Sequence, residues 1–421
     1  MRGESLLESA RDSAAVDHFR CGRRTGTRDC ATTVRWSRGA IADELFVLCR
    51  PSDVASPVAR QAAAVYQALV EVLSSEGIGP DALVSETVFF RRIAQDLDVV
   101  LDTRVAVLGE AGAGSRRASM TCIEQPPLSE GVHLELSAVA LVPHQPRSCP
   151  ASEVTRAGSC TCQACLPGTR AKIVRIGDQT CLYAGDIVGR GSGAVEQASD
   201  MFDAAEALLG EAGMSFGDVV RTWIYLRDID RDYDSLNTAR RDFFRRHGIE
   251  RKPASTGVQG IAASSVHDFS MSLYAVKSPQ PLLATVMSTK ALNEAWTYGA
   301  DFSRGLRVVD ANNDTLYVSG TASIAEAGQT VHAGDFEAQG ERMLHNIASL
   351  LAAQGSSFRD IASAIAYLKH PADAPALRAI FHKHGFDGFP VALVQAPLCR
   401  PELLCETEAI AILPRLRQQE Q

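Results

Sequence analysis

The clearest chemical signal in the sequence is a pair of carboxylates, Glu406 and Glu408, in the apolar segment LLCETEAIAI. In a β-strand both side chains lie on one face of a sheet. Burial in an apolar cleft raises the pKa of a carboxylic acid toward neutrality, so Glu406 is a candidate general acid that delivers a proton to a substrate. A strand Glu can also face solvent or pair with an Arg at an interface, and the residues alone leave these roles open.

Cys399 lies seven residues before Glu406, in APLCRPELLCE. Neither a base nor a metal ligand stands beside it in the sequence. We therefore expect Cys399 to shape a site and to supply a polar group rather than to act as a nucleophile. The alternative is a small buried hydrophobic residue.

Signatures of other enzyme classes are missing from the sequence. GRGSG at 189–193 follows a strand-like segment but lacks the spacing of a dinucleotide fingerprint, which favours a surface loop. No P-loop, H-E-x-x-H or G-x-S-x-G pattern is present. The sequence therefore implies no cofactor.

The composition is that of a soluble globular protein, because 421 residues at 46% hydrophobic and 22% charged can form a packed core and more than one domain. No segment has the roughly 20 apolar residues of a membrane helix, and the first residues lack the apolar centre of a signal peptide, so we expect a cytoplasmic protein with no membrane partner. The net charge of −8 argues against a nucleic-acid partner. An anionic ligand would have to be held by a few local Arg residues.

Eleven cysteines without an export signal indicate reduced thiols rather than a disulfide framework. Four of them cluster in a Pro/Gly/Ser-rich stretch: Cys149, Cys160, Cys162 and Cys165. Four-thiolate zinc sites usually contain two C-x2-4-C pairs, whereas this stretch has one lone Cys and a C-x-C-x2-C run. A solvated linker is favoured over a structural metal site, and we expect no metal.

A threefold internal repeat becomes visible when three segments are aligned on glycines: Gly77, Gly213 and Gly355. Each segment begins with Gln and has apolar residues at i, i+3, i+4 and i+7, which predicts an amphipathic helix that ends at the glycine. A short turn and an apolar strand follow. The spacings between the glycines are 136 and 142 residues, so the chain carries three copies of one unit.

Each copy also opens and closes with an apolar strand, as in TLYVSGTASI and LLCETEAIAI. The order strand, helix, strand, helix, strand predicts an α+β unit with helices on one face of a sheet. Three uncovered sheet faces can bury one another around a central axis, which predicts a pseudo-trimer. The expected division is a 1–39 extension, unit 1 at 40–148, a Cys-containing linker at 149–170, unit 2 at 171–278 and unit 3 at 279–421.

The helix-glycine-turn-strand block and closing strands such as ETEAIAI resemble the RidA (YjgF-like) superfamily, whose members are homotrimers with clefts between subunits. The deaminases of that family hold a substrate carboxylate with an Arg that follows a Pro-Ala-type pair. The matching places contain Pro253-Ala254-Ser255 in the second copy and Pro390-Val391-Ala392 in the third. Only the first copy offers an Arg, Arg116 or Arg117, together with Glu135.

A narrower resemblance rests on five segments in order: RTWIYLRDID, KPASTGVQG, WTYGADFSRG, YVSGTASI and LCRPELLCETE. Together they resemble the chorismatases, RidA-fold enzymes that cleave chorismate to pyruvate and a ring product. The resemblance implies that Glu406 protonates the enolpyruvyl methylene carbon. Gly320 and Cys399 correspond to positions that divide the family by product, and this pair implies the branch that forms 3-hydroxybenzoate, an enzyme of lyase or hydrolase type in secondary metabolite biosynthesis.

Chorismate carries two carboxylates, so the resemblance implies Arg donors in the cleft. Arg304 is the first candidate, and the other expected substrate-binding residues are Tyr298, Gly299, Phe302, Thr256, Gln259, Tyr225 and Arg400. The place of Glu406 is expected to be taken by Ser272 in the second copy, and Glu408 is expected to matter less than Glu406. RRDFFRRHG at 240–248 predicts a solvated helix face with Phe243 and Phe244 turned inward.

Two other functions stay open at this point. A RidA-type enamine or imine deaminase would use Arg117 and Glu135. A non-catalytic pseudo-trimer that binds a small molecule is the second. In each case we expect a single chain to supply all three units.

Overall fold

The computed structural model describes residues 19–20, 26–27, 29–109, 118–144, 152–154, 171–263, 266–280, 282–298 and 301–413. These residues form three sheets, each built by one unit with the order strand, strand, helix, strand, helix, strand, strand. In unit 1 the elements are β3 (Cys30–Ser37), β4 (Ala42–Pro51), α2 (Val58–Ser75), β5 (Leu83–Phe90), α3 (Ile93–Leu108), β6 (Ser119–Glu124) and β7 (Leu134–Pro143).

Units 2 and 3 repeat this order of elements. Unit 2 contains β9 (Ala171–Ile176), β10 (Gln179–Val188), α5 (Ala194–Glu211), β11 (Val219–Leu226), α6 (Ile229–His247), β12 (Ala254–Gln259) and β14 (Phe269–Lys277). Unit 3 contains β16 (Gly305–Val309), β17 (Asp314–Ala322), α7 (Phe336–Ala352), β18 (Ile361–Leu368), α8 (Ala374–His384), β19 (Val391–Gln395) and β20 (Cys405–Leu413).

The three sheets have the same strand order: β3-β4-β7-β5-β6, β9-β10-β14-β11-β12 and β16-β17-β20-β18-β19. In each sheet the closing strand lies in the centre and runs antiparallel to both neighbours, and only the last strand of the order pairs in parallel. The α+β fold of three repeated units is therefore confirmed.

The glycines of the repeat lie just after α2, α5 and α7, where the chain turns back toward the sheet. Gly77, Gly213 and Gly355 have φ of +74°, +68° and +75°, a conformation that favours glycine. A short 3-10 helix then leads into the next strand in each unit: η1 (Pro80–Ala82), η3 (Phe216–Asp218) and η5 (Phe358–Asp360).

A buried glutamine in the first turn of each repeated helix fastens that helix to the closing strand. Gln61, Gln197 and Gln339 accept hydrogen bonds from the backbone N–H of His133, Asp268 and Leu404 at 2.8, 2.9 and 2.9 Å. These bonds satisfy half-buried backbone N–H groups just before the central strand.

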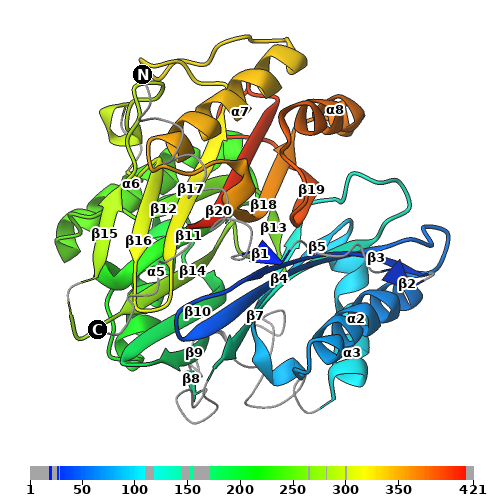
Figure 1. The fold of residues 1–421 in the computed structure, drawn as a ribbon. Coiled ribbons are helices and arrows are strands. Elements are labelled where there is room, and N and C mark those ends of the chain that lie inside the picture. Colours follow the sequence, from blue (N-terminus) through cyan, green and yellow to red (C-terminus); the bar gives the residue numbers. More distant parts are fainter. Residues whose placement is uncertain are drawn as a thin grey trace, which may run out of the picture.

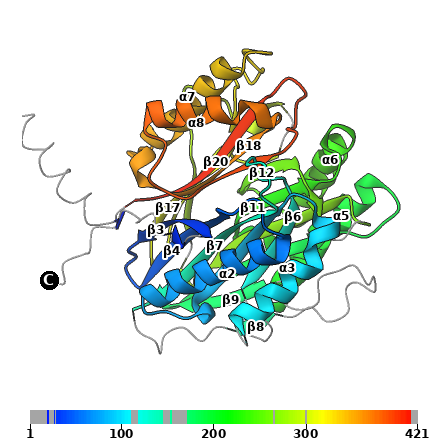
Figure 2. The same cartoon turned by 90° about the vertical axis from the view of Figure 1, so that its right-hand side faces the viewer.

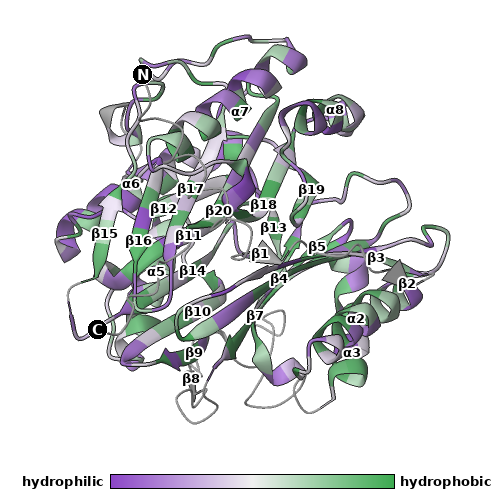
Figure 3. Cartoon of the chain, in the orientation of Figure 1, coloured by the Kyte–Doolittle hydropathy of each residue, from purple (hydrophilic) through white to green (hydrophobic). Residues whose placement is uncertain are grey.

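Helices cover the outer face of each sheet, and the inner faces meet in the centre of the molecule (Figures 1 and 2). Figure 3 shows hydrophobic and hydrophilic residues on opposite sides of outer helices such as α2 and α7. One apolar cluster contains residues of all three inner faces, among them Val84, Val220 and Leu306. The units therefore bury one another around a central axis, as the pseudo-trimer requires.

Several short strands join units or extend sheets beyond the predicted elements. β3 lies within the expected 1–39 extension, where β1 (Phe19–Arg20) and β2 (Gly26–Thr27) also pair with it. β8 (Ser152–Val154) pairs with β9, β15 (Leu283–Val286) with β16, and β13 (Ile261–Ala262) of unit 2 with β6 of unit 1. The first and the parallel strand of each unit were not among the predicted strands, since neither shows a long apolar alternation.

Candidate active site

A cleft of about 500 Å³ lies between units 2 and 3, within the range of small-molecule sites. Unit 2 contributes one face of α6 and the strand β12, and unit 3 contributes the loop before β16, the end of β17 and the segment that leads into β20. The cleft is lined by Tyr233, Asp234, Asn237, Thr238, Arg240, Arg241, Ser255, Gly257, Phe302, Arg304, Gly320, Ala322, Ile324, Cys399, Arg400, Leu403 and Glu406.

Glu406 enters this cleft from β20, where it lies opposite Ala322 of β17 and Tyr367 of β18. Its side chain is 5% exposed. Burial is the main cause that raises the pKa of Glu406 to about 8, with Glu408 adding to the rise and Arg304 and Arg221 opposing it. A carboxyl group with this pKa is protonated at neutral pH, which is the state that a general acid needs.

Gly320 provides the space that the Glu406 carboxyl group occupies. A β-bulge in β17 between Val318 and Thr321 contains this glycine. A Cβ added at Gly320 would lie 2.1 Å from Glu406 Oε1 and 3.1 Å from Thr256 Cγ2, which is far inside van der Waals contact for the first atom. The missing side chain therefore leaves room for the acid itself.

Cys399 lines the same cleft beside Tyr233, which hydrogen-bonds to its thiol. Burial, and after it the carboxyl group of Glu406, raises the pKa of Cys399 to about 12. The thiol is therefore protonated at neutral pH, and a protonated thiol is a poor nucleophile. Cys399 is free, as are the other cysteines that the described residues include.

Two buried guanidinium groups flank Phe302 at the edge of the cleft. The guanidinium carbons of Arg240 and Arg304 lie 5.5 and 5.7 Å from the centre of the Phe302 ring. Arg304 Nε donates to the carbonyl of Asn293 at 3.1 Å, and Arg240 Nη2 donates to Asn237 Oδ1 at 2.6 Å. These contacts fix two cations beside an aromatic ring, an arrangement suited to an anionic, unsaturated ligand.

Arg400 also lines the cleft, but its guanidinium group is engaged by a neighbouring loop. Its Nη1 donates to the carbonyl of Gly328 at 2.8 Å and to Thr330 Oγ1 at 3.2 Å. Together with Arg241 the lining has four Arg residues against the two acids Asp234 and Glu406. The cleft is therefore locally basic in an acidic chain.

Three expected substrate-binding residues do not line the cleft. Thr256 Oγ1 accepts from Gly320 N at 3.0 Å and so braces the bulge. Gln259 Oε1 accepts from Ile229 N at 3.2 Å at the start of α6. Tyr225 is buried on β11 and lines a separate cavity in the centre of the molecule. Tyr298 ends the short helix η4 (Ala295–Tyr298), and Gly299 lies outside the described residues.

Six α6 residues of the lining were not expected from the sequence: Tyr233, Asp234, Asn237, Thr238, Arg240 and Arg241. Phe243 and Phe244 are buried as predicted, but Arg240 is only 4% exposed and is not on a solvated face. The spacing of Tyr233, Asn237 and Arg240, i, i+4 and i+7, puts them on one side of the helix. This polar stripe on an otherwise amphipathic helix was the available signal.

The strand registers correct the expected correspondence between units. Tyr367, Tyr225 and Phe89 each lie twelve residues after the repeat glycine of their unit. In the sheets they pair with Glu406, Ser270 and Glu135, respectively. Ser270, not Ser272, therefore takes the place of Glu406 in unit 2, and Ser272 takes the place of Glu408. In unit 1 the corresponding Glu135 forms a bidentate ion pair with Arg50, at 2.6 and 3.0 Å.

The place of the deaminase Arg can also be located by register. Met120, Ser255 and Val391 pair with the strand residues that lie nine positions after the repeat glycines. None of the three is an Arg. Arg116 and Arg117 lie outside the described residues.

The described part of the chain bears on two expected absences, a metal site and a membrane-spanning helix. Within it, no group of three or more His, Cys, Asp or Glu side chains is placed to hold a metal ion. Cys149, Cys160, Cys162 and Cys165 lie outside the described residues. Among the helices described here, none is long and apolar enough to span a membrane.

Comparison with known proteins identifies the family. The sequence profile described as Endoribonuclease L-PSP matches residues 176–276 and 297–413, just over half of the chain, in units 2 and 3. The 3-aminoacrylate deaminase RutC of Acinetobacter baylyi is 30% identical over 100 residues, which are 24% of this chain and 79% of that protein.

A crystal structure of a chorismatase superposes with a TM-score of 0.57 at 16% identity and covers 79% of this chain and 93% of that chain. At this identity the likeness concerns the fold, which extends over most of both chains. The chain therefore belongs to the Endoribonuclease L-PSP family, the RidA/YjgF superfamily, and shares the repeated fold of a chorismatase.

Proposed function

We propose that this protein is a chorismatase that cleaves chorismate to pyruvate and 3-hydroxybenzoate in the cleft between units 2 and 3. The observation that carries the proposal is the carboxyl group of Glu406, buried in a cleft with four Arg residues, where burial raises its pKa to about 8. A neutral acid beside bound anions suits reactions in which a proton is transferred to the ligand. Cleavage of an enol ether is one of them, because the reaction begins with protonation of carbon.

In the proposed reaction Glu406 gives its proton to the methylene carbon of the enolpyruvyl group. The ether carbon becomes an oxocarbenium-like centre. The adjacent ring hydroxyl then attacks the ring carbon that carries the ether oxygen, the bond between that carbon and the ether oxygen breaks, and pyruvate leaves with this oxygen as its keto group. The remaining oxygen bridges the two ring carbons; its bond to the carbon that first carried it breaks, and loss of the proton from the other carbon makes the ring aromatic and balances the proton that Glu406 donated. Pyruvate and 3-hydroxybenzoate together contain the atoms of chorismate, so no water is consumed overall.

Arg304 and Arg240 are proposed to bind the substrate carboxylates, with Phe302 between them against the ring. Arg241 is engaged by Asp301, with Nε 3.4 Å from the carboxylate, and Arg400 by the loop at Gly328, so both are assigned supporting roles. Tyr298 and Gly299 are kept as proposed contacts of the ring on the sequence resemblance alone. Cys399 and Tyr233 are proposed to hold the ring hydroxyl in the position that leads to the aromatic product.

Deamination of the kind named for the Acinetobacter relative is less well supported. The places that correspond to the deaminase Arg hold Met120, Ser255 and Val391. Glu135, the unit 1 counterpart of Glu406, is held by Arg50 in an ion pair and does not line the cleft.

The test is incubation of the full chain with chorismate, followed by measurement of pyruvate and of aromatic products by chromatography. Equal amounts of pyruvate and 3-hydroxybenzoate support the proposal. A dihydrodiol with pyruvate would keep the enzyme class but contradict the product. Hydrolysis of 2-aminoacrylate without any turnover of chorismate would contradict the chorismatase function and favour deamination.

A further inference from the structure

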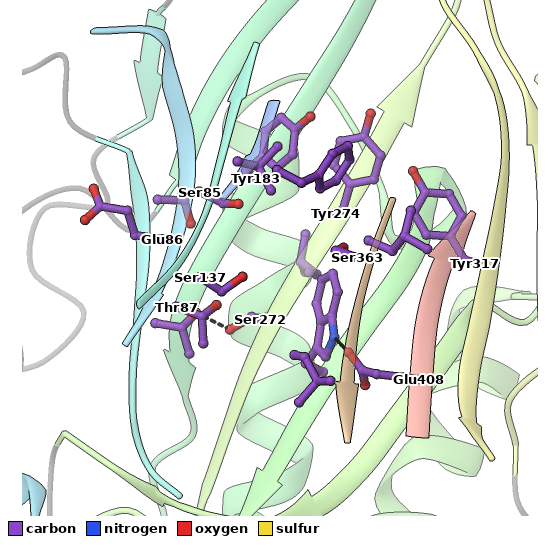
Figure 4. A pocket seen from close by; sticks show the side chains of 18 of the residues that line it. Ser85, Glu86, Thr87, Ser137, Tyr183, Ser272, Tyr274, Tyr317, Ser363 and Glu408 are labelled. Atoms are coloured by element: carbon purple, nitrogen blue, oxygen red, sulfur yellow. Dashed lines mark hydrogen bonds between the residues drawn. The ribbon is translucent and has the colours of Figure 1, made fainter. Parts of the chain in front are cut away.

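A second carboxylate, Glu408, lies next to the proposed acid on the same face of β20, but it points toward the centre of the molecule. It is 4% exposed and lines a central cavity of about 120 Å³ with residues of all three units (Figure 4). This cavity is large enough for only a few water molecules. Glu408 therefore borders a different space from Glu406, although the two residues are adjacent on the strand face.

Three donors converge on the Glu408 carboxylate. Arg221 Nη2 lies 2.7 Å from Oε2, Trp223 Nε1 lies 2.5 Å from Oε1, and the hydroxyl of Tyr367 lies 3.3 Å from Oε2. Arg and Trp side chains only donate hydrogen bonds, so this set of partners matches an ionised carboxylate.

Arg221 connects Glu408 to the cleft. This residue is 1% exposed, and its guanidinium group stacks on the Trp223 ring at 4.7 Å. Its Nη2 also donates to Thr256 Oγ1 at 2.6 Å, and the same oxygen accepts from Gly320 N at 3.0 Å. Two donors thus fix Thr256, and Thr256 in turn fixes the backbone of Gly320 against the Glu406 carboxyl group.

Electrostatic interactions also connect Glu408 with Glu406. The pKa of Glu406 depends on the charges of Glu408 on β20, Arg221 on β11 and Arg304 on the loop before β16. In turn, the Glu406 carboxylate raises the pKa values of Cys405 on β20, Tyr367 on β18 and Cys399 on the adjoining loop. Glu408 is the charged group that most raises the pKa of Glu406, and the two Arg residues lower it. A negative charge at Glu408 therefore opposes ionisation of Glu406.

Only unit 3 has this pair of acids at the two strand positions. Unit 2 has Ser270 and Ser272, and unit 1 has Glu135 and Ser137. The second carboxylate, Glu408, is thus present in the unit whose first carboxyl group, Glu406, lines the cleft.

We propose that Glu408 is a positioning residue that holds Gly320 in place through Arg221 and Thr256 and keeps the neighbouring Glu406 in its proton-donating form. The inference rests on the proposed function, in which Glu406 is the acid. It assigns Glu408 no contact with the substrate.

The test is the pH dependence of kcat/KM for chorismate cleavage in the wild type and in Glu408→Gln. The wild type should lose activity as pH rises through about 8, where Glu406 ionises. In Glu408→Gln the loss should begin about one pH unit lower, so that activity falls about tenfold from pH 6 to pH 8 in the variant but only about twofold in the wild type. Glu408→Asp keeps the charge and should keep the wild-type midpoint.

Two controls separate this role from a structural one. Glu402→Gln removes an exposed carboxylate near β20 and should change nothing. Arg221→Gln with Glu408→Gln removes both members of the buried pair, so it avoids an unpaired buried charge. Its midpoint should be lowered less than in Glu408→Gln, because Glu408 raises the pKa of Glu406 more than Arg221 lowers it. If Glu408→Gln unfolds, the double variant carries the test. Variants with reduced stability but an unshifted midpoint would overturn the proposal.

A direct titration separates this inference from the proposed function. The carboxyl carbon of Glu406, followed by ¹³C NMR and assigned with Glu406→Gln, should titrate at lower pH in Glu408→Gln whether or not chorismate is turned over. A midpoint that does not move overturns the positioning role. A moved midpoint in a protein that is inert toward chorismate overturns only the proposed function.

Discussion

At the scale of single residues, the proposed acid and Gly320 depend on each other. The Glu406 side chain is only 5% exposed because Gly320, the bulge residue next to it, has no side chain. The resemblance assigns Gly320 to product choice, which its missing side chain could serve by leaving space near the substrate ring, whereas the geometry gives that space to the carboxyl group. Both ideas concern product formation, but they predict different results for the same substitution.

Gly320→Ala is expected to displace the Glu406 carboxyl group, because the new Cβ would lie 2.1 Å from Oε1. Chorismate cleavage should fall by about 10²-fold or more, as expected when a general acid is misplaced. The measurement is kcat with both products quantified. A variant that stays active but forms a dihydrodiol would instead favour the explanation by substrate space.

Cys399→Val tests product choice without moving the acid. The thiol beside Tyr233 would be replaced by an apolar group of similar size. We expect the fraction of 3-hydroxybenzoate among the products to fall while pyruvate release continues, which chromatography can measure. Tyr233→Phe, which removes the other partner of this contact, should change the product ratio in the same direction. An unchanged ratio in both would contradict the assigned role.

At the scale of elements, the sequence predicted what has a strong periodic pattern. The three amphipathic helices that end at Gly77, Gly213 and Gly355, and the apolar strands after them, are where expected. The parallel strand β12 was not predicted, because ASTGVQ has no apolar alternation and is held by its neighbours in the sheet. Likewise Arg240 looked solvated, because its burial depends on Phe302 of another unit.

Arg240→Met should weaken chorismate binding, because α6 presents this cation to the cleft. Loss of a charge-assisted contact is expected to raise KM by about 10- to 100-fold, with a smaller effect on kcat. Steady-state kinetics provide the measurement. Arg245→Met is the matched control, since that side chain is 78% exposed on the same helix. Equal effects of the two substitutions would contradict a binding role for Arg240.

At the scale of the whole molecule, the three units enclose a central cavity that none of them could form alone (Figure 4). Glu44 of β4 lines it and accepts a hydrogen bond from Asn313 of unit 3. Burial, and then Asp310, raises the pKa of Glu44 to about 7. The packing of the units is therefore linked to pH.

A single chain supplies the three units of a RidA-like trimer, and we propose that it is monomeric.

The stability of the protein should fall as pH rises from about 5 through 7. The folded state holds the Glu44 proton more tightly than the unfolded chain, whose pKa is 4.5, so the stabilisation is complete below 4.5 and is lost as pH rises through 7. Glu406 extends the same loss through about 8. Denaturant titrations at several pH values should show that the free energy of unfolding depends less on pH in Glu44→Gln than in the wild type. An equally steep pH dependence in the variant would contradict the role of Glu44.

The central claim is that Glu406 delivers the proton that starts cleavage, and Glu406→Gln tests it most directly. Glutamine keeps the shape and the hydrogen-bonding capacity of the side chain but cannot supply that proton. The single-turnover rate of pyruvate release should be measured at pH 6.5 with saturating chorismate, beside the wild type and Glu402→Gln. The account predicts a loss of at least about 10²-fold in Glu406→Gln alone, with chorismate binding retained. Pyruvate release by folded Glu406→Gln at a rate near that of the wild type would contradict it.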